Sequence, residues 1–167
     1  MRRKEQVHLD QLVGIDWDDG KELHKLGGEA AAFLAAMPWC RNVKNIYFDS
    51  GISKIAVFLC EIEGNGGYPF AWVVVGDVPP AYSFKGEIGL DVLRMYAEEL
   101  SQWCEAVRAG SSTKNLTRVL ERGSFRPLPE TLEIADLVWS RVEFIRGKLI
   151  PFVEQQEEDF ARDNAPG

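Results

Sequence analysis

Hydrophobic residues between positions 23 and 37 recur at spacings of three and four, which is the period of an amphipathic helix. They are Leu23, Leu26, Ala30, Phe33, Leu34 and Met37. Pro38 follows directly and cannot continue a helix, so we expect the helix to end there. Gly27 and Gly28 interrupt the pattern, which favours a kink or a break at this pair. Upstream, residues 7–15 fit either a short helix or a strand.

The hydrophobic period then changes to two, as in β-strands. Three runs follow this period, at residues 43–49, 54–62 and 70–75. In the second and third runs both alternating sets are apolar, so both faces of these strands must be covered. The linker between them, "EGNGGYP", contains the glycines that a hairpin loop needs for positive φ. The sequence therefore predicts an antiparallel meander of three to four strands.

Two further helical patterns follow the predicted sheet. The first has apolar residues at Leu90, Leu93, Ala97, Leu100, Cys104 and Val107, and Gly110 is suited to end it. The second has them at Ile134, Val138, Val142, Ile145, Leu149 and Phe152. We expect Pro151 to bend or end this second helix.

The order of these elements predicts an α+β fold, with the meander packed by the N-terminal helix and the two long C-terminal helices. Residues 1–153 form a single domain in this prediction, because 167 residues suit one domain better than two. Residues 154–167 are expected to form an acidic, flexible C-terminal tail. The two C-terminal helices cover one face of the sheet. The first helix is the favoured cover for the other face, and a second copy of the chain is the alternative.

Pro79-Pro80-Ala81-Tyr82 matches a PPxY motif, which binds WW domains when it lies exposed as a polyproline II segment. Here the prolines follow directly on the most apolar run of the chain, and Gly76-Asp77 is a strong strand breaker. Tyr82 and Phe84 alternate around Ser83, as in a short returning strand. We therefore interpret the diproline segment as a rigid corner of the scaffold, with Tyr82 folded back on the domain.

Composition places the chain among ordinary globular proteins, with 46% apolar and 27% charged residues. The net charge is −7, of which residues 154–163 contribute −4 (five acids and one arginine), so the rest of the chain carries −3. A body without a basic stripe argues against nucleic-acid binding. No apolar run reaches the length of a membrane span, and no signal peptide is evident, so we expect a cytoplasmic protein without membrane contact.

The three cysteines have no CxxC spacing, and Cys60 and Cys104 fall within apolar patterns, where a free cysteine acts as a small core residue. The acidic loop at residues 16–20 fails the EF-hand spacing, because loop positions five and twelve would be Gly20 and Gly27. We therefore expect no metal site and no cofactor.

The usual catalytic motifs are also missing. The sequence contains no nucleophile elbow, no His-Glu-x-x-His and no P-loop, so no catalytic residue is assigned and the chain is more typical of a non-enzyme. Asp77, at the end of a predicted strand, is the acid best placed for a ligand site, and Tyr82 is the nearby aromatic that could share it. The simpler interpretation of Asp77 is a turn residue that bonds its own backbone.

Five tryptophans occur in the chain. Three of them fit core patterns, whereas Trp17 and Trp39 fall in predicted loops, as does Tyr68 near the hairpin tip. Exposed aromatic residues are typical of protein interfaces. We therefore predict that Trp17, Trp39 and Tyr68 contact a partner, if the chain has one.

The block "KIAVFLCEIEGNGGYPFAWVVVGDVPPAYSF", followed by "YAEELSQWCEAVRAG", resembles a group of uncharacterised small bacterial proteins. In that group an apolar hairpin runs into a "VVVGD-PPAY" turn and then an amphipathic helix. The resemblance covers roughly residues 52 to 110 and implies a bacterial origin. It carries no assigned activity.

Two functions remain after these exclusions. The favoured one is a non-enzymatic protein-binding or accessory domain, immunity-like in character, with a protein partner or a homodimer as its assembly. The alternative is a small-ligand-binding or enzymatic domain with a pocket at the strand end near Asp77. A flat aromatic patch favours the first, and a deep cavity favours the second.

Overall fold

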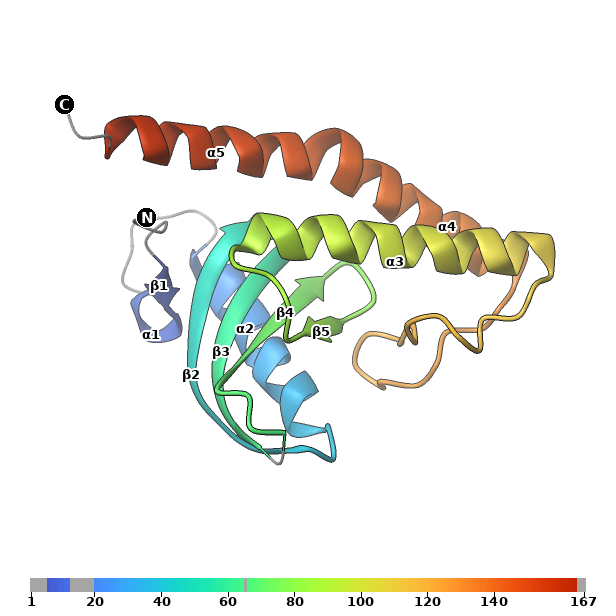
Figure 1. The fold of residues 1–167 in the computed structure, drawn as a ribbon, viewed down its shortest axis with the longest axis horizontal. Coiled ribbons are helices and arrows are strands. Elements are labelled where there is room, and N and C mark those ends of the chain that lie inside the picture. Colours follow the sequence, from blue (N-terminus) through green and yellow to red (C-terminus); the bar gives the residue numbers. More distant parts are fainter. Residues whose placement is uncertain (1–5, 13–19, 65, 165–167) are drawn as a thin grey trace.

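The computed structural model describes residues 6–12, 20–64 and 66–164, and it places one antiparallel sheet between helices on its two faces (Figure 1). The strands are β1 (Val7–His8), β2 (Cys40–Gly51), β3 (Ile55–Gly64), β4 (Phe70–Gly76) and β5 (Ala81–Ser83). The α-helices are α1 (Leu9–Leu12), α2 (Gly20–Ala35), α3 (Gly89–Ala109), α4 (Leu132–Phe144) and α5 (Ile150–Asp163), with a π-helical segment η1 (Ile145–Leu149) between the last two.

The sheet is a meander in which the strands lie in the order of the chain, β1-β2-β3-β4-β5, and all neighbours are antiparallel. The predicted α+β fold and the pairing of the two apolar runs are confirmed: Phe58 on β3 lies opposite Val73 on β4. The strand count is five rather than three to four. The additional strand β1 has two residues, too few to produce a recognisable alternation, whereas β5 contains Tyr82 and Ser83 of the expected returning strand.

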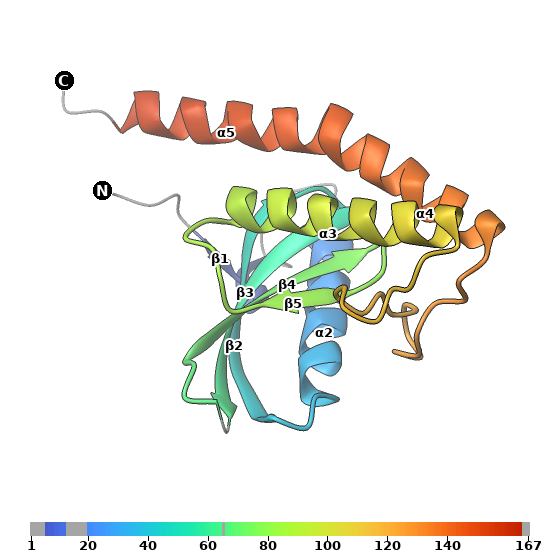
Figure 2. The ribbon, with the colours of Figure 1, turned by 45° about the vertical axis from the view of Figure 1, so that its right-hand side comes forward.

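Both faces of β3 and β4 are buried, as the two-sided apolar pattern predicted. Trp72 and Val74 point into the core under α3 and the C-terminal helices, whereas Val73 and Val75 point into a second core under α2. Figure 2 shows the sheet between these two helical layers. Helix α2, which is the predicted N-terminal helix, therefore covers the second face of the sheet, as favoured. A second copy of the chain is not needed to cover it.

Helix α2 is continuous through its glycine pair, so the expected break is wrong. Gly27 is buried and faces Leu9 of α1 and the ring of Phe58, whereas Gly28 is exposed with no atom near its missing Cβ. The first glycine thus allows close packing of α1 against α2. The sequence left residues 7–15 open between a strand and a short helix. The described part, residues 7–12, contains both, first the strand β1 and then the helix α1.

Helices α4, η1 and α5 form one long helical rod, which crosses above α3 in Figure 1. Pro151 neither ends it nor separates a tail, because residues up to Asp163 are helical. The preceding π-helical turn explains this result: the N–H of Ile150 donates to the carbonyl of Ile145, one residue further back than in an α-helix. A proline lacks the donor and clashes with the carbonyl four residues earlier, and a wider turn relieves both conflicts. The acidic segment 154–163 therefore belongs to helix α5.

The diproline segment is a fixed corner of the fold. The hydroxyl of Tyr96 on α3 donates to the carbonyl of Pro79 at 2.5 Å, and the N–H of Asp77 donates to the carbonyl of Lys54 at 2.7 Å. Gly76 has φ of 129°, and a Cβ there would overlap the backbone of Lys54, so the chain can turn here only with glycine. The segment is thus held on both sides, which agrees with the interpretation as scaffold.

Within the described ranges, no helix combines the length and the apolar character needed to cross a membrane.

Candidate functional site

The two residues predicted to share a ligand site lie apart. Asp77 forms an ion pair with Arg141 of α4, with 2.9 Å between Oδ2 and Nη2, and the Arg141 Nε also donates to the Asp77 carbonyl at 2.9 Å. Tyr82 lies on the opposite side of the corner, where its ring centroid is 5.1 Å from that of Trp39. Asp77 and Tyr82 line different cavities. Tyr82 on β5 points towards α2, with its ring centroid 6.1 Å from that of Phe33, whereas Asp77 lies before the diproline and meets α4.

Two of the three predicted partner-binding residues are brought together. The ring of Tyr68, at the β3–β4 turn, stacks on Phe84 with a centroid distance of 4.3 Å and an interplanar angle of 8°. Trp39, at the α2–β2 turn, contacts the other side of this cluster, with its centroid 5.0 Å from that of Phe84. Trp17 and the acidic loop at residues 16–19 lie outside the described residues.

The rings of Trp39, Tyr68, Tyr82 and Phe84 form one continuous group. Together with Phe70, which lines the adjoining hollow beside Tyr68 and Phe84, we call them the aromatic surface. Three of its members are exposed, Tyr68 by 51%, Phe70 by 42% and Tyr82 by 39%. Phe84 was predicted only as a residue of a returning strand, yet it is the ring that joins Tyr68 to Trp39. Its position in sequence, 16 residues from Tyr68, gave no signal of this contact.

A hollow of about 490 Å³ adjoins the aromatic surface on the sheet face that also carries α3. Tyr68, Phe70 and Phe84 line it together with Tyr47 and Trp72. Glu61 is the charged residue in its lining. Aromatic rings beside a single carboxylate can bind a cation, through the negative faces of the rings and through the charge of the acid.

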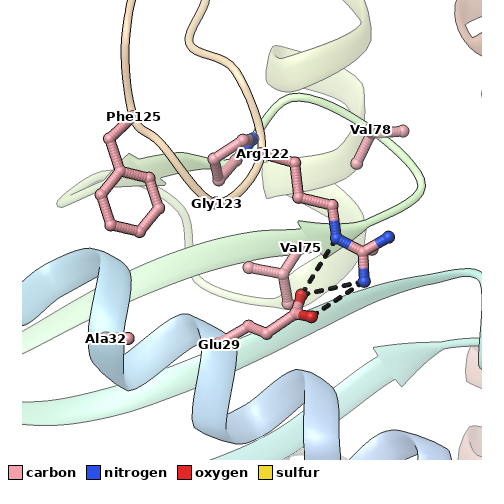
Figure 3. A pocket seen from close by; sticks show the side chains of 9 residues that line it. Glu29, Ala32, Val75, Val78, Arg122, Gly123 and Phe125 are labelled. Carbon is pink, nitrogen blue, oxygen red and sulfur yellow. Dashed lines mark hydrogen bonds and ion pairs between the residues drawn. The ribbon is translucent and has the colours of Figure 1, made fainter.

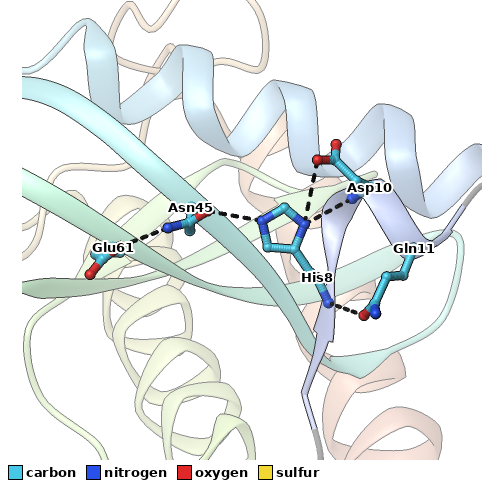
Figure 4. A network of polar contacts seen from close by, with 5 residues as sticks. All are labelled: His8, Asp10, Gln11, Asn45 and Glu61. Atoms are coloured by element: carbon cyan, nitrogen blue, oxygen red, sulfur yellow. Dashed lines mark hydrogen bonds and ion pairs between the residues drawn. The ribbon is translucent and has the colours of Figure 1, made fainter.

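A chain of hydrogen bonds fixes the carboxylate of Glu61 (Figure 4). Asn45 Nδ2 donates to Glu61 Oε1 at 2.8 Å, and Asn45 Oδ1 lies 3.0 Å from His8 Nε2. The Asp10 N–H donates to His8 Nδ1 at 3.1 Å, so the neutral imidazole carries its proton on Nε2 and donates it to Asn45. The network orients Glu61, and its members His8, Asp10, Gln11, Asn45 and Glu61 include no serine, threonine or cysteine. Sequence reasoning did not find it, because it joins β1, β2 and β3 through their register.

A second cavity, of about 470 Å³, lies at the end of β4 between α2 and the hairpin at residues 119–128 (Figure 3). Gly76 and Val78 line it, on either side of Asp77, but Asp77 itself does not. Arg122 of the hairpin forms a bidentate pair with Glu29 of α2 at its edge, with Nη2–Oε1 2.9 Å and Nε–Oε2 3.2 Å. This cavity occupies the strand end that the sequence indicated, with different polar residues.

The cysteines are buried thiols without a reactive environment. Burial raises the pKa of Cys60 to about 12 and that of Cys104 to about 11, and it also raises the pKa of Cys40. A thiol with such a pKa is a poor nucleophile at neutral pH. Among the described residues, no group of three His, Cys, Asp or Glu side chains is placed to hold a metal ion.

The fold and its surface define an α+β protein with a five-stranded antiparallel meander, an exposed aromatic surface with a hollow beside it, and a cavity at the end of β4. Comparison with protein-family models, with curated proteins and with solved structures finds no significant match. The functional argument therefore depends on the residues themselves.

Proposed function

We propose that this protein is a non-enzymatic protein-binding domain, an accessory or immunity-like partner of another protein. The resemblance of the central block to small bacterial proteins supports a bacterial origin, and the composition supports a cytoplasmic location. The partner binds at the aromatic surface and at the hollow beside it.

The observation that carries this proposal is the stacked pair Tyr68 and Phe84 at the centre of an exposed aromatic group. Tyrosine and tryptophan contribute large contact areas at a low entropic cost and dominate the binding energy of protein interfaces. Stacking on Phe84 holds Tyr68 in place before binding, so little further freedom is lost on association. Trp39, Tyr68 and Phe84 come from three separate turns or connections, and together they form a preorganised patch.

The hollow supports a partner with a basic contact surface. Glu61 lies among aromatic rings there, and Asn45 holds its carboxylate in a fixed orientation. An arginine or lysine side chain of the partner would meet both the carboxylate and the ring faces. The net charge of −7 also favours approach of a positively charged protein.

The test compares two double variants of the full chain in affinity capture from a lysate of the organism that carries the gene. Y68S/F70S removes two exposed rings of the aromatic surface. L137S/F152S is the matched control, because these residues are 55% and 45% exposed on α4 and α5. We expect a stoichiometric protein with wild type and with the control, and about tenfold or greater loss with Y68S/F70S. Equal recovery with both variants would exclude this surface.

Titration calorimetry with the captured protein then tests the role of charge. Glu61→Gln should weaken binding by about five- to tenfold at low salt and should reduce its salt dependence. If light scattering instead finds that the wild-type chain forms a dimer which Y68S/F70S abolishes, the surface binds a second copy and the heterologous partner is excluded.

A further inference from the structure

We propose that the cavity between α2, the end of β4 and the hairpin at residues 119–128 binds a small, mainly apolar organic molecule that carries one anionic group, such as a carboxylate or a sulfonate. This site is independent of the protein-binding function. It lies on the α2 face of the corner, whereas the hollow with Glu61 lies on the other face of the sheet.

The size and the walls of the cavity suit an apolar ligand. Its volume of about 470 Å³ falls within the range of small-molecule sites, roughly 300 to 1,000 Å³. Apolar side chains form most of its wall: Ala32, Val75, Val78, Pro80 and Phe125. Such walls offer few hydrogen-bond partners to water, so an apolar molecule displaces poorly held water when it enters.

The polar group of the ligand is an acceptor in this proposal, because the carboxylate of Glu29 is already paired with Arg122, whose guanidinium has donors left over. Two of the nine lining residues are charged, Glu29 and Arg122. Both oxygens of Glu29 accept hydrogen bonds from Nε and Nη2 of Arg122, with Nη2–Oε2 3.1 Å completing the set. Among the described residues Nη1 of Arg122 makes no hydrogen bond or ion pair, so that edge of the guanidinium is available.

Glu29 acts here as a positioning residue. It holds one edge of the planar guanidinium and leaves the other edge for a bidentate or charge-assisted contact with an anion. In Figure 3 the Nη1 side of Arg122 points away from Glu29, on the side of Val78. An uncharged apolar molecule would use the same walls but not this contact.

Phe125 closes the site from the hairpin. Its φ is 58°, which makes it the one non-glycine residue with positive φ among the described residues. Its ring packs edge-on against Phe33 at 5.2 Å between centroids, beside the cavity. A bulky residue in this conformation is strained and is held by its surroundings. The strained backbone of Phe125 thus places its ring in the cavity wall, where a bound ligand would contact the ring.

The experiment titrates the full-length protein with two fluorescent probes, anilinonaphthalene sulfonate and the uncharged N-phenyl-naphthylamine. We expect one saturable site for each. Arg122→Gln should weaken the anionic probe by about tenfold and leave the neutral probe within about twofold. Equal loss of both probes, or no loss of either, would overturn the role of Arg122.

Ala32→Trp fills the cavity from α2, and Ala161→Trp makes the same change at an exposed helical position of α5. Ala32→Trp should abolish binding of both probes, whereas Ala161→Trp should bind them as wild type does. Circular dichroism confirms that each variant is folded, and amide shifts near Val75 and Val78 locate the probe. Undiminished probe binding by Ala32→Trp would overturn the site. Amide shifts of the wild-type protein that fall away from Val75 and Val78 would also overturn it, and this second readout does not depend on a folded variant.

Discussion

The backbone N–H of Gly89, at the first turn of α3, donates a hydrogen bond of 3.0 Å to Oδ1 of Asp49 on β2. Asp49 is 4% exposed, and its second oxygen accepts from Gln6 Nε2 at 2.9 Å. A carboxylate at this point compensates the partial positive charge of the helix N-terminus. A Cβ on residue 89 would overlap the Asp49 carboxylate and the Ser50 hydroxyl, so this contact requires glycine. The strand therefore fixes where the helix begins.

Loss of this contact should destabilise the fold measurably. Asp49→Ala removes a buried and a part-buried hydrogen bond to a carboxylate and should lower the free energy of unfolding by about 2 to 3 kcal/mol. Asp49→Asn keeps an acceptor but loses the charge, and should cost about 1 kcal/mol. Urea denaturation measures both. Asp77→Asn is the control, because its ion pair is exposed and should contribute no more than about 1 kcal/mol. Equal effects of Asp49→Ala and Asp77→Asn would contradict the argument.

The two adjacent glycines of α2 should respond oppositely to alanine. Gly28 is exposed and has free space at its Cβ position, so Gly28→Ala should raise the free energy of unfolding by about 0.5 to 1 kcal/mol through helix propensity. At Gly27 the new methyl group would overlap a Leu9 methyl and lie 3.2 Å from the Phe58 ring. Gly27→Ala should therefore lower it by about 1 kcal/mol. Thermal melts of the two variants check the difference, and equal stabilisation would mean that α1 does not pack here.

The cysteines should be inert in the folded protein. With the Cys60 pKa at about 12, only about one thiol in ten thousand is ionised at pH 8. Ellman's reagent should react with no thiol of the native protein within minutes, and with all three after unfolding in urea. Rapid reaction of one thiol without urea would show that this cysteine is accessible to solvent and is not a core residue.

Glu99 should make stability fall as the pH rises. Burial raises the pKa of its carboxyl group, although a hydrogen bond from Thr117 and the charge of Lys85 partly offset this effect. A folded-state pKa above the unfolded value means that the folded protein binds the proton more tightly, so stability is lost as pH rises from the unfolded to the folded pKa. Glu99→Gln should thus have a higher melting temperature than wild type at pH 7, with the gap closing below about pH 4.

Glu98→Gln is the matched control for this pH series. Glu98 forms an exposed ion pair with Arg146 at 3.0 Å, so its neutralisation should leave the melting temperature at pH 7 unchanged or slightly lower. A gain in stability from Glu98→Gln, or a Glu99→Gln gain that persists at pH 4, would count against burial as the cause.

The candidate site was only partly predictable from the sequence. Exposure of Tyr68 followed from its place at a hairpin tip, because turn residues lie at the surface. Its stacking on Phe84 did not follow, since that contact depends on where the chain returns after the diproline corner. The pairing of Asp77 with Tyr82 was wrong for the same reason: proximity in sequence does not say which side of a corner each side chain takes.

What the sequence determined by itself is local and periodic. The alternation at residues 54–62 and 70–75 specified two strands buried on both faces, and the spacing of three and four specified the helices, because side-chain direction follows directly from backbone period. Gly76 and the prolines marked the corner, since few other residues adopt that backbone.

Only the tertiary structure decided the rest. A proline ends or kinks most helices, yet the helical structure continues past Pro151 through a π-helical turn and packing on α3. Glu29 and Arg122 are 93 residues apart, and His8 meets Asn45 across 37 residues. Such contacts arise from strand register and from the packing of whole elements, which depend on the free energy of the complete fold rather than on any local pattern.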